Sequence, residues 1–339
     1  MTRSISPAMS RRSPELVSEY IHIPDNIETF EFDTYLIEEC FVLKNIAGYF
    51  FKTILSELKL DIDEICLTKF IGYICEHYNR NYFHNFQHAV NILQMTYMLL
   101  NKSNMTHKIK PHIVFAGLIA ALAHDVDHPG NTNSYEINSM SKLARLYNDI
   151  SVLENHHCAL AFELMDHTGL SQCFPDKAIY REIRRTIIAS ILGTDMSKHT
   201  ECLAKFSRVP LDNHVLTIDE QITLMSSLVH FADLSNPIKP FDVCIEWSQR
   251  ISLEFYQQTV KEELEGLPIH SFMKVRDKRT MCLNEISFIL NISLPTWGLF
   301  VTRFNHMSFL REKLESNLQQ WRDLEAKYNA SDEIYQLDY

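Results

Sequence analysis

Two histidines and two aspartates occupy positions 124–128, directly after an apolar run. The segment 124–130 reads HDVDHPG, and the run before it, Ile113 to Ala123, has 11 residues. That length suits a buried helix and falls short of the roughly 20 residues that cross a bilayer. Because Pro129 disfavours helical backbone at the residue before it, we expect the cluster on the last helical turn and the loop after it. Aspartate and neutral histidine both bind divalent ions, so these residues predict a metal site.

A capped helix end with solvated charges is the alternative interpretation, and the fully apolar run before the cluster argues against it. Two further histidines lie about 40 residues upstream: His84 and His88 are four positions apart. On a helix they would share one face, with Cβ atoms about 6 Å apart. Such a pair alone is more often a core or surface feature, but the 124–128 cluster favours ligation.

Another carboxylate ends a second apolar helix. Thr217 and Glu220 have the spacing of a capping box, which predicts a helix start. Apolar residues then recur with helical period until Asp233. A carboxylate at the end of an apolar stripe is partly buried and must be paired or bind a metal, so Asp233 is a candidate ligand.

Two other polar segments are ambiguous from their residues alone. The stretch 153–157 reads LENHH, and the stretch 194–196, after an apolar run from Ile183 to Leu192, reads TDM. Each suits a helix end with polar caps, which is the interpretation we favour without further context.

Composition indicates an all-α protein. The chain has 339 residues, 46% of them hydrophobic, with only 8 Gly and 11 Pro, and helical apolar periods outnumber alternating runs. No repeat or long linker divides it, so we expect one compact multi-helix domain. The net charge of −11 argues against non-specific nucleic-acid binding.

The cysteines and the termini point to an intracellular protein. The eight cysteines include no C-x-x-C pair, which fits free thiols in a reducing compartment. Residues 1–15 are rich in Ser, Pro and Arg without the apolar core of a signal peptide, so we expect a flexible tail there and a second one at 331–339. We expect no segment long enough to cross a bilayer, and we predict a cytoplasmic protein with no membrane span.

Taken together, the polar segments resemble a known family. The motifs are HNFQH at 84–88, HDVDHPG at 124–130, LENHH at 153–157, TDM at 194–196 and ADLSNP at 232–237. Their order and intervals resemble those of the class I cyclic nucleotide phosphodiesterase catalytic domain, over roughly residues 30–328. Local motifs are most similar to the ninth mammalian type, and a protist enzyme fits equally. The resemblance implies an HD-type, all-helical catalytic domain of about sixteen helices, which we place at 16–330.

The resemblance also implies roles for individual residues. A tightly bound Zn²⁺ would be held by His88, His124, Asp125 and Asp233. Asp125 would also bridge to a second ion, Mg²⁺ or Mn²⁺, whose water shell would be supported by His128, Glu154, His157 and Thr194. The two metal ions would polarise the phosphate and activate a water. His84 would be the general acid that protonates the departing O3′, with the Glu154 carboxylate favouring its charged form.

The base pocket departs from the family pattern at one position. The resemblance places the base among Met196, Asn236, Ile251 and Phe288. Counting back from Pro295, the family's purine-reading Gln is replaced here by Glu285. A Gln amide both donates and accepts, whereas an ionised Glu only accepts, so weak substrate binding is expected unless Glu285 is protonated.

The first functional hypothesis is metal-dependent hydrolysis of cAMP, cGMP or both to 5′-nucleoside monophosphates, which terminates second-messenger signalling. Two alternatives are an HD-type phosphohydrolase of another nucleotide and, because of Glu285, a nucleotide-binding pseudoenzyme. The expected partner is a cyclic nucleotide and not a nucleic acid. A homodimer and a regulatory region outside this chain both stay open.

Overall fold

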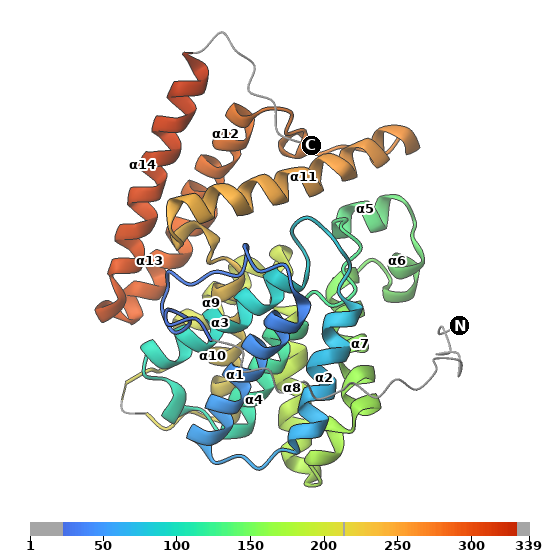
Figure 1. Cartoon of the computed structure of the whole chain (residues 1–339), viewed down its shortest axis with the longest axis vertical. Helices are drawn as coiled ribbons and strands as arrows, with labels where there is room; N and C mark the ends of the chain where they lie inside the picture. The colour runs from blue at the N-terminus through green and yellow to red at the C-terminus, as the bar shows by residue number, and fades with distance from the viewer. Residues whose placement is uncertain (1–22, 213, 331–339) are drawn as a thin grey trace.

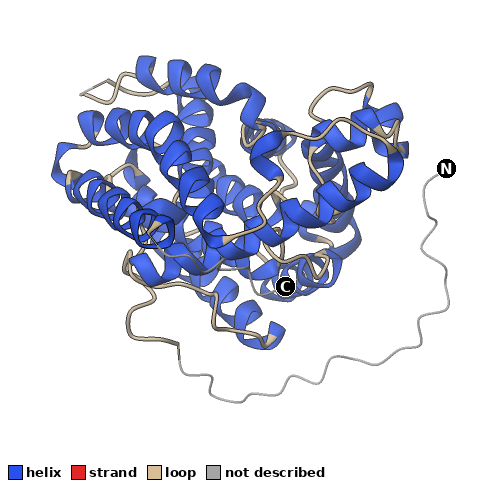
Figure 2. Cartoon of the chain, turned by 90° about the horizontal axis from the view of Figure 1, so that it is seen from above, coloured by secondary structure: helices blue, strands red, loops and turns tan. Residues whose placement is uncertain are grey.

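The computed structural model describes residues 23–212 and 214–330, so the predicted tails lie outside the described residues. The described part is helical and forms a single domain, as predicted (Figure 2). Its fourteen α-helices, two fewer than the resemblance implied, are α1 (Cys40–Leu58), α2 (Glu64–His77), α3 (Phe86–Lys102), α4 (Pro111–Ala123), α5 (Asn133–Asn138), α6 (Lys142–Tyr147), α7 (Val152–Thr168), α8 (Lys177–Leu192), α9 (His199–Arg208), α10 (Ile218–Asp233), α11 (Phe241–Glu265), α12 (Lys278–Phe288), α13 (Leu294–Arg303) and α14 (Phe309–Asn329).

Short helical turns fill most of the remaining connections. They are the 3₁₀-helices η1 (Thr106–Lys108), η2 (Leu170–Cys173), η3 (Met196–Lys198), η4 (Asn236–Ile238), η5 (Ser271–Met273) and η7 (Asn305–Met307), and the π-helix η6 (Ile289–Ser293).

Helix α4 is the centre of the fold. It is apolar on every side, and all its residues after Pro111 are buried, as expected for a helix surrounded by others. It packs against α1, α3, α8 and α10. Its last residue is Ala123, so the 124–128 cluster lies on the loop at its carboxyl end, as predicted.

Helix α10 brings the second predicted carboxylate to the same region. The capping box forms as expected: the Thr217 hydroxyl accepts the Glu220 N–H, and the Glu220 carboxylate accepts the Thr217 N–H. The helix packs against α3, α4 and α8 and ends at Asp233. His88, in the first turn of α3, lies 3.2 Å from both His124 and Asp233, so the amino end of α3 meets the carboxyl ends of α4 and α10.

Helices α11 to α14 form a second group beside this core. The 25-residue α11 runs across the molecule, and α14 lies along one side next to α12 and α13 (Figure 1). One continuous helical segment runs from Lys278 to Arg303 through α12, the π-helix η6 and α13. These 26 residues are long and apolar enough to cross a membrane. This corrects the expectation that no segment reaches that length. The run is a partly buried core helix, with Trp297 and Phe300 fully enclosed.

Candidate active site

Four buried or half-buried side chains form a cluster of metal-ligand atoms, two histidine nitrogens and two carboxylate oxygens. His88 Nε2 lies 3.2 Å from His124 Nε2 and 3.2 Å from Asp233 Oδ1, and Asp125 Oδ2 lies 3.5 Å from His88 Nε2 and 3.0 Å from His124 Nε2. His124 Nε2 is 3.3 Å from Asp233 Oδ1. Donor atoms at about 2.0–2.1 Å from a tetrahedral ion are about 3.3 Å apart, so the spacing fits a metal ion.

The electrostatics of this group also suit a divalent cation. Burial raises the pKa of Asp125 and Asp233, but the positive charge of protonated His124 outweighs it and holds both carboxyl pKa values below their usual range. The two carboxylates are therefore ionised, and a buried pair of negative charges needs a cation. His124 Nδ1 lies 2.9 Å from the Ala121 carbonyl and donates to it, so Nε2 is the nitrogen that faces the group. Against burial, the two carboxylates hold the pKa of His124 well above its usual value, and a metal ion bound there would take the place of the Nε2 proton.

Asp125 joins this group to a second one. Its Oδ2 faces His88 and His124, whereas its Oδ1 lies 3.7 Å from His157 Nε2. Asp125, His128 and His157 each offer a ligand atom within 4.8 Å of the others. His157 donates from Nδ1 to the Val126 carbonyl at 2.7 Å, and its buried Nε2 has no hydrogen-bond partner among the described residues. This unpaired nitrogen can accept a hydrogen bond from a water bound to a second metal ion. The residues present therefore fit a site for two metal ions.

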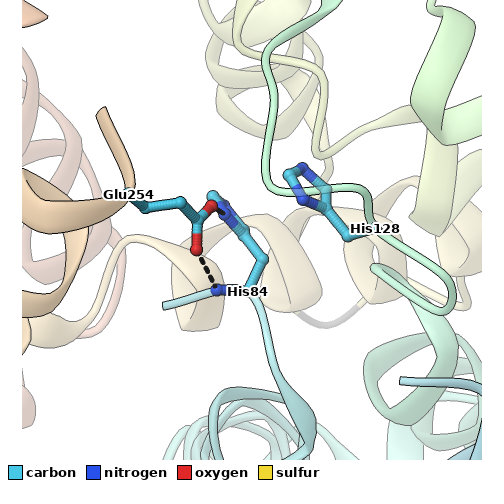
Figure 3. A group of neighbouring side chains, drawn as sticks. All are labelled: His84, His128 and Glu254. Carbon is cyan, nitrogen blue, oxygen red and sulfur yellow. Dashed lines mark hydrogen bonds and ion pairs between the residues drawn. The ribbon is translucent and has the colours of Figure 1, made fainter. Parts of the chain in front are cut away.

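His84 lies beside this site, between a carboxylate and another imidazole (Figure 3). Its Nδ1 is hydrogen-bonded to Glu254 Oε1 of α11, and Glu254 Oε2 accepts the backbone N–H groups of Phe83 at 2.9 Å and His84 at 3.1 Å. The His128 ring stacks on the His84 ring with centroids 4.0 Å apart. Because Nδ1 is engaged by Glu254, the proton on Nε2 is the one available for transfer.

The contact with Glu254 sets the charge of His84. Burial lowers the pKa of His84, but the Glu254 carboxylate outweighs it and raises that pKa to about 9. Burial likewise raises the pKa of Glu254, and the His84 imidazolium lowers it to about 2. The pair is therefore an imidazolium and a carboxylate at neutral pH. His128 is neutral, because burial and the neighbouring His84 charge hold its pKa well below its usual value.

Two expectations about His84 need correction. It does not share a helical face with His88, because Asn85 caps α3 by accepting the His88 N–H at 3.1 Å, so His84 precedes the helix. Its carboxylate partner is Glu254 and not Glu154. Both oxygens of Glu154 instead accept from Asn133 Nδ2, at 3.1 and 2.9 Å. Glu254 follows His84 by 170 residues, and only its position between apolar residues of α11 hinted that it is buried.

Asp127 turns away from the other acidic and imidazole groups of the 124–128 cluster. Its backbone is left-handed, with φ of 60°, which directs the side chain elsewhere. Its carboxylate accepts from His156 Nε2 at 2.8 Å and from Asn79 Nδ2 at 3.1 Å. Asp127 therefore fastens the loop, and it is not among the metal ligands that the family resemblance implied.

The other predicted site residues lie on surrounding elements. Thr194 follows α8, and its hydroxyl donates to the Ile191 carbonyl at 2.8 Å. Burial and then Asp195 raise the pKa of Glu154 to about 7, against the hydrogen bonds from Asn133. Met196 is exposed at the start of η3, and Asn236 opens η4 with a buried Oδ1 that has no partner among the described residues.

Three predicted base-pocket residues lie on two helices that contact each other. Ile251 belongs to α11, whereas Glu285 and Phe288 belong to α12, and all three are half-buried. Burial outweighs the opposing influence of the neighbouring Ser248 hydroxyl of α11 and raises the pKa of Glu285 to about 7. Both charge states of Glu285 are therefore populated near neutral pH.

Comparison with known proteins agrees with this geometry. Residues 83–314 match the family model for 3′,5′-cyclic nucleotide phosphodiesterase. The chain is 33% identical to the mouse high affinity cGMP-specific 3′,5′-cyclic phosphodiesterase 9A over 84% of this chain and 54% of that protein. It is 36% identical to the human high affinity cAMP-specific and IBMX-insensitive 3′,5′-cyclic phosphodiesterase 8A over 74% of this chain and 32% of that protein. It thus spans about half of these relatives or less.

A solved structure extends the similarity to the whole fold. The phosphodiesterase domain of the RhoPDE fusion protein from the choanoflagellate Salpingoeca rosetta superposes with a TM-score of 0.85 at 35% identity, over 90% of this chain and 97% of that one. The matched family segment contains both histidine and carboxylate groups and the His84–Glu254 pair. By the family match and by the fold, this chain is a member of the 3′,5′-cyclic nucleotide phosphodiesterase family.

Proposed function

We propose that this chain hydrolyses the 3′,5′-cyclic nucleotides cAMP and cGMP to 5′-nucleoside monophosphates. The observation that carries the proposal is Asp125, whose two oxygens face two separate histidine groups beside the His84–Glu254 pair. The names of the two curated relatives cover both nucleotides. The complete donor sets argue against the pseudoenzyme alternative, and the family match argues against another HD-type phosphohydrolase.

The metals we propose follow from the donor types. His88, His124, Asp125 and Asp233 would hold Zn²⁺, which accepts mixed nitrogen and oxygen ligands in a tetrahedral arrangement. Asp125 would share a second, harder ion, Mg²⁺ or Mn²⁺, whose remaining ligands are waters near His128, His157, Glu154 and Thr194. Two such ions, when bound, supply Lewis acidity toward the phosphate and a water of lowered pKa.

The role of this chain's own residues in the bond-breaking step is proton delivery. When the P–O3′ bond breaks, the departing O3′ needs a proton, and His84 holds one on Nε2. Glu254 fixes the ring through Nδ1, and the stacked His128 ring limits its rotation. His84 is therefore the catalytic acid, and Glu254 is a positioning residue that keeps it charged.

Product analysis tests the proposed function. Purified protein with Mg²⁺ or Mn²⁺ is incubated with cAMP and, separately, with cGMP, and the products are separated by chromatography. We expect 5′-AMP and 5′-GMP, because the general acid protonates the departing O3′. A 3′-monophosphate, or no hydrolysis of either nucleotide by a metal-loaded protein, would contradict the proposal.

Replacing Glu254 by Gln is expected to reduce kcat more at alkaline pH than at acidic pH. Without the Glu254 carboxylate the pKa of His84 falls, because burial lowers it and only the weaker influence of Asp125 and Asp233 still raises it. The imidazolium, present in the wild type up to a pH near 9, is then lost near neutral pH. The measurement is the pH profile of kcat from pH 5.5 to 9. An unshifted alkaline limb in this variant would contradict the assigned role.

We propose that ionised Glu285 weakens the binding of the purine base. A protonated carboxyl group offers a donor and an acceptor, as an amide does, whereas the ionised form only accepts. Since the pKa of Glu285 is about 7, lowering the pH from 8 to 6 converts most of it to the protonated form. We expect KM for cAMP to fall over this interval, because adenine presents both a donor and an acceptor on its readable edge.

Replacing Glu285 by Gln should remove this pH dependence and lower KM for cAMP at pH 8 by about tenfold, if about 1.4 kcal/mol of mismatch is relieved. Metal content should not change. Glu315→Gln is the matched control, because Glu315 is an exposed carboxylate of α14 that pairs with Arg311. An unaltered KM for both nucleotides in Glu285→Gln would mean that Glu285 lies outside the base pocket.

A further inference from the structure

His88 differs from His124 and His157 in what orients its ring. His124 and His157 each donate from Nδ1 to a backbone carbonyl, that of Ala121 at 2.9 Å and that of Val126 at 2.7 Å. Such a bond at the second ring nitrogen commonly orients a metal-binding histidine. His88 Nδ1 is buried and has no hydrogen-bond partner among the described residues. The orientation of the His88 ring therefore rests on packing.

Two aromatic rings provide that packing. Between ring centroids, Phe83 lies 4.8 Å from His88, and Trp247 of α11 lies 6.1 Å from it. Phe83 and Trp247 also contact each other edge to face, with centroids 5.4 Å apart. Trp247 is 1% exposed, so its ring cannot turn unless its neighbours move. The position of Trp247 thus determines where the His88 ring can lie.

Asp33 fixes Trp247 from a segment that precedes the first helix. Trp247 Nε1 donates to Asp33 Oδ1 at 3.0 Å, and Asn91 Nδ2 donates to Asp33 Oδ2 at 2.9 Å. The Asp33 side chain is 3% exposed, and the enclosed ammonium group of Lys239 lies 3.7 Å from its Oδ2. A cation and two N–H donors compensate this buried carboxylate. Since Asn91 follows His88 by one turn of α3, Asp33 joins that helix to Trp247.

Residues 27–37, here called the strap, hold Asp33 in place. Gln94 Nε2 of α3 donates to the Thr29 carbonyl at 2.8 Å. Gln87 Nε2, also of α3, donates to the Ile37 carbonyl at 2.6 Å. Both ends of the strap are therefore bound to α3, and Asp33 lies between them.

We propose that Asp33 is a positioning residue for the metal ligand His88 and acts on it through Trp247. The inference rests on the zinc site of the proposed function, and the strap lies outside the segment that the family model matches, which begins at residue 83. Without the acceptor at Asp33, the Trp247 ring can shift, and His88 Nε2 then moves relative to the other three donor atoms. Zinc binding weakens although no ligand is lost.

The affinity of Trp247→Phe for Zn²⁺ tests the proposal without use of the hydrolytic activity. The phenyl ring keeps an aromatic contact with Phe83 and His88 but lacks the N–H that Asp33 accepts, while the ion pair of Asp33 with Lys239 remains. The metal-free protein is titrated with Zn²⁺ in competition with a chromogenic chelator. We expect the affinity to fall by about tenfold or more, the usual effect of replacing a residue that orients a metal ligand.

Trp321→Phe is the matched control. Trp321 of α14 is also fully enclosed, it packs on Phe241, and its Nε1 has no hydrogen-bond partner among the described residues. The control removes the same atoms from the core, so it should lower the melting temperature and leave the zinc affinity unchanged.

Asp33→Asn changes the same contact from its other side. An amide has one acceptor oxygen, which can serve either Trp247 or the Asn91 and Lys239 donors but not both. This variant should therefore also bind zinc more weakly, and it decides the question if Trp247→Phe does not fold by circular dichroism.

The absorption spectrum of the Co²⁺-loaded protein is the second readout, because it depends on the arrangement of the ligand atoms and not on stability. We expect Trp247→Phe and Asp33→Asn to change its bands and Trp321→Phe to leave them unchanged. Unchanged affinity and spectrum in the folded Trp247→Phe variant, equal changes in Trp321→Phe, or a wild type that binds no zinc would overturn the proposal. A wild type that binds zinc tightly but hydrolyses neither nucleotide would contradict the proposed function alone, because both readouts here follow the metal site.

Discussion

Replacing His124 or Asp233 by Ala is expected to abolish hydrolysis of both cyclic nucleotides and to leave the protein without tightly bound metal. Each substitution removes one of four donor atoms, in which each histidine nitrogen lies 3.0–3.5 Å from both carboxylate oxygens. The three donors that remain cannot complete a tetrahedral site, which weakens metal binding strongly. Elemental analysis beside kcat is the measurement, with circular dichroism to confirm that the variants fold.

Asp127→Asn is the matched control for this prediction. Asp127 lies in the same loop, but its carboxylate contacts His156 and Asn79 in place of the donor groups. Asparagine also tolerates the left-handed backbone at this position. The variant should keep its metal. Full metal occupancy with normal turnover in Asp233→Ala would show that Asp233 is not a metal ligand. Equal metal loss in Asp127→Asn would show that metal binding depends on the loop as a whole.

Replacing His84 by Ala should keep both metals and the fold but lower kcat by about 10²-fold to 10⁴-fold, the usual contribution of a general acid. The loss should depend on the leaving group. A nitrophenyl phosphodiester releases a stable phenolate that needs no proton, so its hydrolysis should fall far less. The measurement is kcat for both substrates in the same preparation.

The control for His84 is His112→Ala. His112 lies at the start of α4 and bonds Glu182 at 2.6 Å, away from the donor groups. Its removal should leave the turnover of folded protein unchanged for either substrate. If His84→Ala lost as much rate with the nitrophenyl ester as with cAMP, His84 would act in binding or positioning, and the acid would have to be another group.

Local chemistry explains why the metal donors could be found from the sequence. The 11-residue apolar run before His124 specifies a buried helix, and the change to polar residues at His124 marks its end. The Thr217–Glu220 box likewise fixes the start of α10, and its apolar period leads to Asp233. In these segments the pattern within a few residues decides both the helix and the burial of its end.

The parts that the sequence did not predict depend on contacts between distant segments. Glu254 reaches His84 only because α11 crosses the amino end of α3, and no pattern near either residue encodes that crossing. The orientation of Asp127 depends on the left-handed backbone of its loop, which aspartate only moderately favours. His84 lies outside the helix that the i, i+4 spacing of the histidines suggested, because Asn85 caps α3. Asparagine is a preferred N-cap residue, and this sequence signal was overlooked in favour of the spacing.

The most direct test of the central claim is the rate of cAMP and cGMP hydrolysis before and after the bound metal is removed. The purified protein is assayed with Mg²⁺ or Mn²⁺, dialysed against a strong chelator, assayed again, and then reloaded with Zn²⁺ and Mg²⁺. A metal-dependent phosphodiesterase loses its production of 5′-AMP and 5′-GMP on chelation and regains it on reloading. Undiminished hydrolysis by protein that elemental analysis shows to be free of metal would contradict the account.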